Sequence, residues 1–143
     1  MEMKLELVPV PVSNVDVAKE FYVEKIGFNA YHDHQVNEQL RFVQLTPKGS
    51  ACSIVIGSGV TQMKPGSQQG LQMVVKDVRA VRDELIGRGV EISDIEEMPW
   101  GKFAFFSDPG SSETVKRART MGPVFEKPHG LDDAVSWVKL HAR

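Results

Sequence analysis

The chain has 143 residues, a hydrophobic fraction of 41% and a net charge of −2, which fits a single globular domain with an ordinary core. Acidic and basic residues are mixed along the sequence without a basic stripe, so nucleic acid is not an expected partner. No apolar run approaches the length of about 18 residues that a membrane-spanning helix needs. The N-terminus lacks the pattern of a signal peptide and Cys52 is the only cysteine, so we expect a cytoplasmic protein without an internal disulfide.

The first half of the chain predicts a strand, a helix and three more strands. Residues 5–12 alternate in polarity, and Pro9 and Pro11 favour a position at the edge of a sheet. Asn14 is typical of a helix cap, apolar residues recur after it at helical spacing, and Gly27 is typical of a helix end. Three further strands are expected at residues 28–34, 39–45 and 51–56, with a turn at 46–50 between the last two.

The same order of elements begins again near residue 71. A strand at 71–75 precedes Asp77, a second helix cap, and the apolar stripe that follows ends at Gly87 and Gly89. An offset of 63 places Asn14 on Asp77, and the repeated order favours an internal duplication. The remaining elements are expected as strands at residues 90–92 and 102–106, a turn at 108–111, and a weakly alternating, basic closing strand at 113–119.

The last part of the chain differs from both halves. Helix breakers at Gly122-Pro123 and Lys127-Pro128 precede a helical pattern at residues 131–141. We therefore divide the chain into a domain at residues 1–119, with halves at about 4–57 and 69–119, and a C-terminal tail with a helix at 120–143. The tail helix is expected either to pack on its own domain, or to contact a partner subunit or cover a pocket.

Short segments in both halves resemble one protein superfamily. They are Val12-Ser13-Asn14-Val15-Asp16, Phe21-Tyr22, Ile26-Gly27-Phe28, Val75-Lys76-Asp77-Val78 and Phe105-Phe106-Ser107-Asp108-Pro109. In this order they resemble the vicinal oxygen chelate superfamily, which includes glyoxalase I, extradiol dioxygenases and bleomycin-resistance proteins, over residues 4–112. The resemblance implies an α+β fold of two βαβββ modules, whose curled mixed sheets surround a cavity, and a homodimer.

The metal enzymes of that superfamily carry four metal ligands on the strands that face the cavity. The resemblance places these positions at Leu7, Val55, Gly70 and Val115. None of these side chains can bind a metal, because divalent cations take His nitrogen or carboxylate oxygen. Glu113 takes the fourth position if the last hairpin shifts. We therefore expect a metal-free protein without a cofactor.

His32-Asp33-His34 is the best remaining candidate for a metal site. Residues two apart on a strand point to the same face, so the two imidazoles are expected to share one. Two His side chains with a carboxylate from elsewhere can hold a metal. The alternative is a polar strand end that runs into a loop. Cys52 lies in an apolar strand without a base beside it, and we expect a buried, unreactive thiol.

Strand parity predicts the lining of the cavity. If the ligand positions face inward, so do the residues two places away. The turn at 46–50 then puts Phe42 opposite Val55 and Gln44 opposite Ser53, and the turn at 108–111 puts Phe106 opposite Glu113. The candidate ligand-binding residues are Phe42, Gln44, Ser53, Val55, Gln72, Trp100, Phe106 and Glu113. The alternative is that these side chains only pack the sheets.

The resemblance and the missing metal ligands together predict a small-molecule-binding protein of the bleomycin-resistance type. Such a protein would sequester or carry an organic ligand as a metal-free homodimer. The alternative is a metal-dependent lyase, isomerase or dioxygenase of the same superfamily, with a relocated site around His32, His34 and Glu113. A third possibility is a scaffold whose cavity is filled by its own side chains. No catalytic residue is identified, so the enzyme is the less favoured interpretation.

Overall fold

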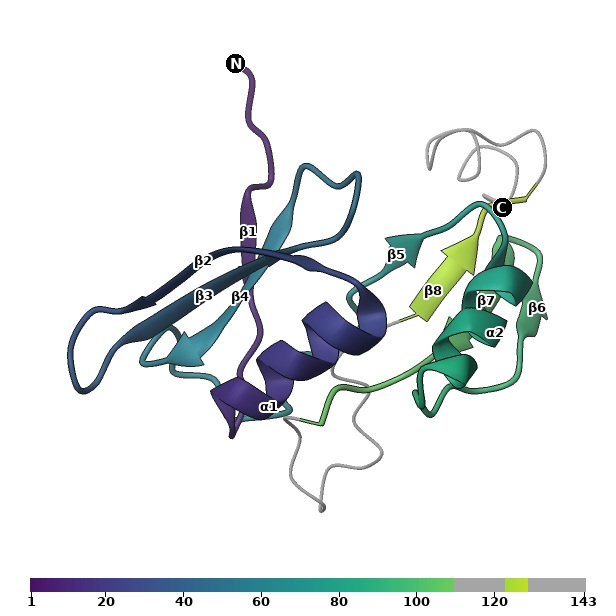
Figure 1. Cartoon of the computed structure of the whole chain (residues 1–143). Coiled ribbons are helices and arrows are strands. Elements are labelled where there is room, and N and C mark those ends of the chain that lie inside the picture. The colour runs from purple at the N-terminus through teal and green to yellow at the C-terminus, as the bar shows by residue number, and fades with distance from the viewer. Residues whose placement is uncertain (110–122, 129–143) are drawn as a thin grey trace.

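The computed structural model describes residues 1–109 and 123–128, which form two four-stranded sheets (Figure 1). The first module runs through β1 (Leu7–Pro9), α1 (Val15–Glu20), the π-helix η1 (Phe21–Ile26), β2 (Asn29–Gln35), β3 (Arg41–Thr46) and β4 (Ser53–Ser58). The second runs through β5 (Met73–Val74), α2 (Val78–Gly87), β6 (Glu96–Met98), β7 (Gly101–Phe105) and β8 (Pro123–Glu126). The strand orders β1-β4-β3-β2 and β5-β8-β7-β6 are equivalent, which confirms an α+β fold of two βαβββ modules whose sheets are not closed.

Both modules begin their helices at the caps that the sequence predicts. The Asn14 side chain accepts a hydrogen bond from the Val17 N–H at 3.1 Å, and the Asp77 side chain accepts one from the Ala80 N–H at 3.0 Å. Gly27 ends the first helical segment with φ at 87°, a conformation that strains residues with a Cβ. These local signals position each helix relative to the strands on either side of it.

The pairing of β3 with β4 differs from the predicted register by two residues. Phe42 lies opposite Gly57, and Gln44 lies opposite Val55, so the predicted pairs of Phe42 with Val55 and Gln44 with Ser53 are wrong. The physical reason is a longer connection between the strands, because β3 continues to Thr46 and β4 begins only at Ser53. A shift of two leaves every side chain on its predicted face, since strand side chains alternate with a period of two.

The second sheet departs further from the sequence prediction. Residues 90–92 form no strand; Ile92 makes only an isolated bridge with Phe106, and β6 supplies the strand that pairs with β7. The place that β4 holds in the first sheet is taken by β8, which runs parallel to β5 and antiparallel to β7. The sequence division had put β8 in the tail. The predicted strand at 113–119 and the predicted helix at 131–141 lie outside the described residues.

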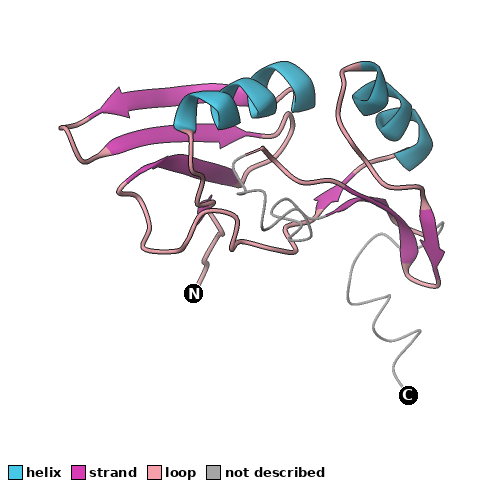
Figure 2. Ribbon diagram, turned by 90° about the horizontal axis from the view of Figure 1, so that it is seen from below, coloured by secondary structure: helices cyan, strands magenta, loops and turns pink. Residues whose placement is uncertain are grey.

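One cluster of buried apolar side chains joins the two modules. In the described part of the chain, both helices lie on the same side of the sheets, so no described helix covers the opposite face of either sheet (Figure 2). Between the modules, the Tyr22 hydroxyl donates a hydrogen bond to the Asp108 carboxylate, and the rings of Phe21 and Phe106 have centroids 6.3 Å apart. The cluster includes Val10, Tyr22, Phe28, Leu45, Ile56, Val78, Leu85, Ala104, Phe106 and Val124. No helix in the described part of the chain has the length and apolarity to span a membrane.

Candidate functional site

The strand pairing determines which side chains share the helix-free face of the first sheet. Val43, Leu45, Ile54 and Ile56 belong to the core under the helices, so their neighbours along β3 and β4 point to the other side. This face, which we call the first helix-free face, carries Leu7, Pro9, Phe42, Gln44, Thr46, Ser53 and Val55, with His32 and His34 on the edge strand β2. The predicted residues Phe42, Gln44, Ser53 and Val55 are therefore brought together.

Three polar side chains form a hydrogen-bonded group in the middle of this face. The Gln44 Nε2 donates to the Ser53 Oγ at 3.1 Å, and the hydroxyls of Ser53 and Thr46 share a hydrogen bond of 2.6 Å. Ser53 is 4% exposed and Thr46 is 9% exposed. Leu7 lies opposite Ser53 on β1, and Val55 lies opposite Gln44. A small polar group within an apolar surface is the usual composition of a ligand pocket.

His32 and His34 extend the first helix-free face onto the edge strand. His32 lies opposite Gln44 and His34 opposite Phe42, which confirms that the two imidazoles share a face. Their ring centroids are 5.8 Å apart with an interplanar angle of 29°, and both side chains are exposed. Neutral imidazoles at this spacing can approach one metal ion, although a stable site needs further ligands.

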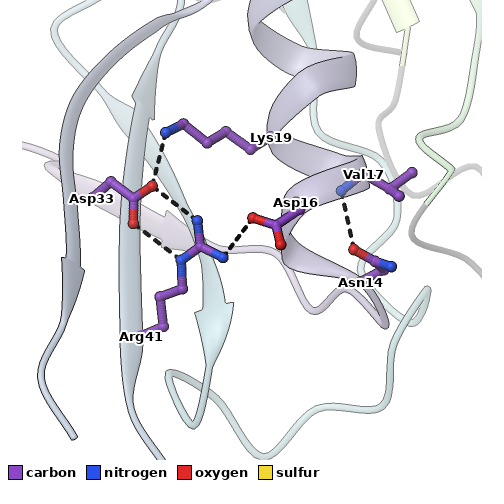
Figure 3. Close-up of polar contacts among 6 residues, drawn as sticks. All are labelled: Asn14, Asp16, Val17, Lys19, Asp33 and Arg41. Atoms are coloured by element: carbon purple, nitrogen blue, oxygen red, sulfur yellow. Dashed lines mark hydrogen bonds and ion pairs between the residues drawn. The ribbon is translucent and has the colours of Figure 1, made fainter.

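Asp33 points to the opposite side of β2 and anchors the strand against α1 (Figure 3). Arg41 donates to its two carboxylate oxygens at 3.1 and 2.9 Å, and the Lys19 Nζ donates at 2.8 Å. A further hydrogen bond of 2.7 Å joins Arg41 to Asp16. The hydrogen bonds from Arg41 and Lys19 hold the pKa of Asp33 well below its usual range, while Asp33 raises the pKa of Arg41. Asp33 is therefore committed to this ion-pair network and faces away from the histidine pair.

The second sheet presents aromatic rings on its helix-free face. Ala104 and Val124 belong to the core, so Phe103, Phe105 and Phe125 lie on the other side of β7 and β8. The ring centroids of Phe103 and Phe125 are 5.4 Å apart with an interplanar angle of 12°, and those of Phe103 and Phe105 are 6.3 Å apart at 14°. This near-parallel aromatic row, the second helix-free face, offers flat apolar surface.

The remaining predicted site residues lie in different places. Gln72 is exposed just before β5, and Trp100 is 43% exposed in the turn between β6 and β7. Phe106 is 3% exposed in the core, so the parity that assigned it to the cavity lining is off by one residue. β7 pairs with β6 and β8 so that Phe103 and Phe105 share one face, and alternation then puts the next residue, Phe106, on the core side. Glu113 lies outside the described residues.

Four residues of the two helix-free faces escaped the sequence analysis. Thr46 was assigned to a turn, although its β-branched side chain after an alternating strand is a signal for one more strand position. Phe103 and Phe105 alternate with Ala104, and that alternation was read in the wrong phase. Phe125 lay in the segment assigned to the tail, and no local pattern marks it as part of the sheet.

The positions that correspond to metal ligands have no ligating side chains where they are described. Leu7 and Val55 both lie on the first helix-free face, next to Ser53 and Pro9. Gly70 precedes β5, and Val115 lies outside the described residues. Within residues 1–109 and 123–128, no group of three or more His, Cys, Asp or Glu side chains is arranged to hold a metal ion. Cys52 is partly exposed, against expectation, and its thiol contacts the Ser53 carbonyl at 3.6 Å.

Two surface hollows lie elsewhere, on the second module. The larger, of about 400 Å³, is lined by Lys76, Asp77, Val78, Arg79, Ile95, Glu97, Lys102 and Glu126. The smaller, of about 200 Å³, is lined by Glu97, Met98, Pro99, Gly101, Lys102, Glu126, Lys127 and Pro128. In the larger one, Glu126 accepts a hydrogen bond from the Val78 N–H at 3.1 Å and so occupies the start of α2 itself. Neither hollow is lined by a predicted site residue, whereas four of those residues meet on the first helix-free face, so we take the helix-free faces as the candidate site.

Comparison with known proteins agrees with the fold. A family model described as the Glyoxalase/Bleomycin resistance protein/Dioxygenase superfamily matches residues 4–113 of the chain. The chain belongs to this superfamily. Among solved structures, a member of the superfamily from Sphaerobacter thermophilus DSM 20745 is 26% identical with a TM-score of 0.70, and the match covers 88% of this chain and 97% of that one.

Two further relatives of this superfamily member are informative. TnmS3, an antibiotic binding protein from Streptomyces sp. CB03234, is 34% identical with a TM-score of 0.71, over 88% of this chain and 95% of that one. The uncharacterized protein YetH of Bacillus subtilis (strain 168) is 30% identical over 112 residues, which cover 76% of this chain and 92% of YetH.

Proposed function

We propose that this superfamily member binds a small organic molecule on its helix-free faces and sequesters or carries it. The observation that carries the proposal is the hydrogen-bonded group of the half-buried Gln44 and the buried Thr46 and Ser53, set among apolar side chains on the first helix-free face. A polar group placed there can orient a ligand, while Phe42 and its apolar neighbours supply contact area. The similarity to an antibiotic binding protein supports the same class of function.

The aromatic row on the second sheet extends the proposal to flat, apolar ligands. Phe105 and Phe125 are half-buried and stack with the more deeply buried Phe103 at nearly parallel angles. Such rings favour offset stacking with another aromatic system, worth about 0.5–1.5 kcal/mol for each contact beyond the burial of area. An aromatic ligand therefore suits this protein better than a sugar or a phosphate ester.

The binding is proposed to need no metal. In this chain Leu7 and Val55 stand at positions where the superfamily's metal enzymes carry ligands, and an aliphatic side chain has no lone pair to donate. The same argument makes enzymatic activity the less favoured possibility, because no described side chain on the first helix-free face forms a nucleophile and base pair. We propose that the protein acts in the cytoplasm as a homodimer.

A second candidate function rests on the histidine pair. His32 and His34 lie side by side on the first helix-free face, and they can hold a metal if a carboxylate such as Glu113 completes the site. Asp33 cannot supply that carboxylate from its ion pairs on the other side of the strand. A metal-dependent lyase, isomerase or dioxygenase with this relocated site is the alternative.

Metal content separates the two functions. The protein, purified without an affinity tag or chelator after growth with Mn, Fe, Ni and Zn, is analysed by mass spectrometry. We expect less than about a tenth of an equivalent of each metal. Near one equivalent, lost in His32→Ala and in His34→Ala, would overturn the metal-free proposal and favour the enzyme.

Ligand binding is tested by thermal shift with a panel of polycyclic aromatic compounds. We expect at least one compound to raise the unfolding temperature, and Phe42→Ala to weaken its binding about tenfold, a loss of about 1.4 kcal/mol. Val17→Ala is the matched control, because Val17 is 44% exposed on α1, on the other side of the sheet. If Phe42→Ala lowers stability but weakens binding no more than Val17→Ala does, the helix-free face is not the binding site.

A further inference from the structure

Ser53 and Thr46 together carry one hydroxyl proton more than the hydrogen bonds of their group use. The Gln44 Nε2 donates to the Ser53 Oγ at 3.1 Å, and a single hydrogen bond of 2.6 Å joins the two hydroxyls. While the Gln44 amide presents its Nε2, and not its Oε1, to Ser53, the proton of the other hydroxyl has no acceptor among the described residues. Both residues are more than nine-tenths buried.

The Gln44 side chain has an acceptor atom that complements this spare hydroxyl donor. Its carboxamide donates through Nε2, and no donor in the described part of the chain reaches its Oε1. The half-buried side chain lies opposite Val55 and two residues before Thr46 on β3, on the same face. The group as a whole therefore presents one spare donor, a hydroxyl, beside one spare acceptor, an amide oxygen.

A buried hydroxyl without an acceptor is costly for the folded protein. The penalty is about 1–3 kcal/mol for each unsatisfied group. An apolar pair of the same shape would avoid that penalty, since replacing both partners of a buried hydrogen bond is nearly neutral. Retaining the hydroxyls on a helix-free face is therefore better explained by a bound molecule than by packing.

We propose that Gln44, Thr46 and Ser53 together recognise a carbonyl oxygen that has an N–H or O–H beside it. This inference rests on the proposed function and names the ligand's chemistry. The spare hydroxyl donates to the ligand carbonyl, and the Gln44 Oε1 accepts from the adjacent N–H or O–H. Carboxamides, lactams and hydroxy-ketones have this pair. The neighbouring side chains Leu7, Pro9, Phe42 and Val55 are apolar, and the one titratable side chain opposite Gln44 among the described residues is His32 on the edge strand. The recognised group is therefore taken as neutral and attached to an apolar ring system.

Two probes of nearly equal shape test the recognised pair. 2-Naphthamide carries a carbonyl with an adjacent N–H, whereas 2-acetonaphthone replaces the amide nitrogen by a methyl group and keeps only the carbonyl. Isothermal titration is expected to give a dissociation constant at least about tenfold lower for the amide, because the ketone leaves the Gln44 acceptor unpaired. Gln44→Met, which removes that acceptor, is expected to abolish the preference.

The hydroxyls are tested by a double variant with a matched control. Ser53→Ala with Thr46→Val removes both hydroxyls at similar volume, and is expected to weaken binding of both probes about tenfold while the fold is kept. Ser58→Ala in the same strand is the control, because Ser58 is exposed at the end of β4. Circular dichroism verifies that every variant is folded.

Each outcome separates this inference from the function on which it rests. Equal dissociation constants of the two probes for the unmodified protein would overturn the recognised pair, while binding of either probe would leave the proposed function in place. Unchanged affinity in the double variant would overturn the role of the hydroxyls. Failure of both probes and of the aromatic panel to bind would overturn the inference and the proposed function together.

Discussion

The hydrogen bond from Tyr22 to Asp108 should be a main contributor to holding the two modules together. Tyr22 is fully buried and Asp108 is 2% exposed, and the residues come from opposite halves of the chain. Tyr22→Phe removes the donor but keeps the ring, which stacks on Phe28 with a centroid distance of 5.4 Å. We expect the free energy of unfolding to fall by about 1.5–3 kcal/mol, the usual contribution of a hydrogen bond to a charged group.

The same bond predicts a pH dependence. Burial raises the pKa of Tyr22 well above its ordinary value of 10.0, and the charge of Asp108 and its hydrogen bond raise it further. Above pH 10.0 the unfolded chain releases the tyrosine proton while the folded chain keeps it, so this contribution is complete below that pH and declines above it. The stability difference between the unmodified protein and Tyr22→Phe should therefore shrink as the pH rises past that value.

Urea denaturation followed by far-ultraviolet circular dichroism measures both effects. Thermal denaturation followed by the same signal should give a melting temperature about 3–12 °C lower for a fall of the predicted size in a chain of this length. Tyr31→Phe is the matched control, because Tyr31 is 63% exposed and its hydroxyl deletion should change the free energy of unfolding by less than about 0.5 kcal/mol. A Tyr22→Phe protein as stable as that control would refute the reasoning.

Other substitutions test other parts of the fold. Asp33→Asn should lower stability by about 1 kcal/mol at neutral pH. Because the pKa of Asp33 is depressed, the difference should begin to decline as the pH falls below 3.8 and disappear only at still lower pH, which acid titration monitored by circular dichroism would reveal. Gly57→Ala should destabilise by about 1–3 kcal/mol, since its Cβ would lie 1.9 Å from a backbone oxygen of β3, whereas Gly87→Ala in α2, with open space around it, should gain about 0.5–1 kcal/mol in the same thermal melts. Glu126→Ala should lose about 0.5–2 kcal/mol and speed amide exchange at the start of α2, because its carboxylate caps that helix; unchanged exchange would contradict this role.

The sequence predicted part of the candidate site correctly even though the predicted register of β3 and β4 was wrong. Gln44 and Ser53 were assigned to one face through a register that is off by two, and the assignment holds because an even shift preserves alternation. Phe106 was wrongly assigned to the cavity lining, because an error of one residue moves a side chain to the opposite face of the sheet. Thr46 was missed because nothing local distinguishes the last residue of a strand from the first residue of a turn.

The two-module plan and the helix caps follow from the sequence itself. Asn14, Asp77 and Gly27 act through hydrogen bonds and backbone angles within a few residues, so a linear pattern suffices to recognise them.

Only the tertiary structure decided which segment closes the second sheet and which aromatic rings share its helix-free face. More than ten residues separate Asp108 from β8 in the sequence. The pairing of β8 at that separation depends on the edges of β5 and β7 and not on local propensity. The same non-local pairing brought Gln44, Thr46 and Ser53 into one hydrogen-bonded group, because a hydrogen bond across strands depends on register, which a sequence pattern constrains only to within an even shift.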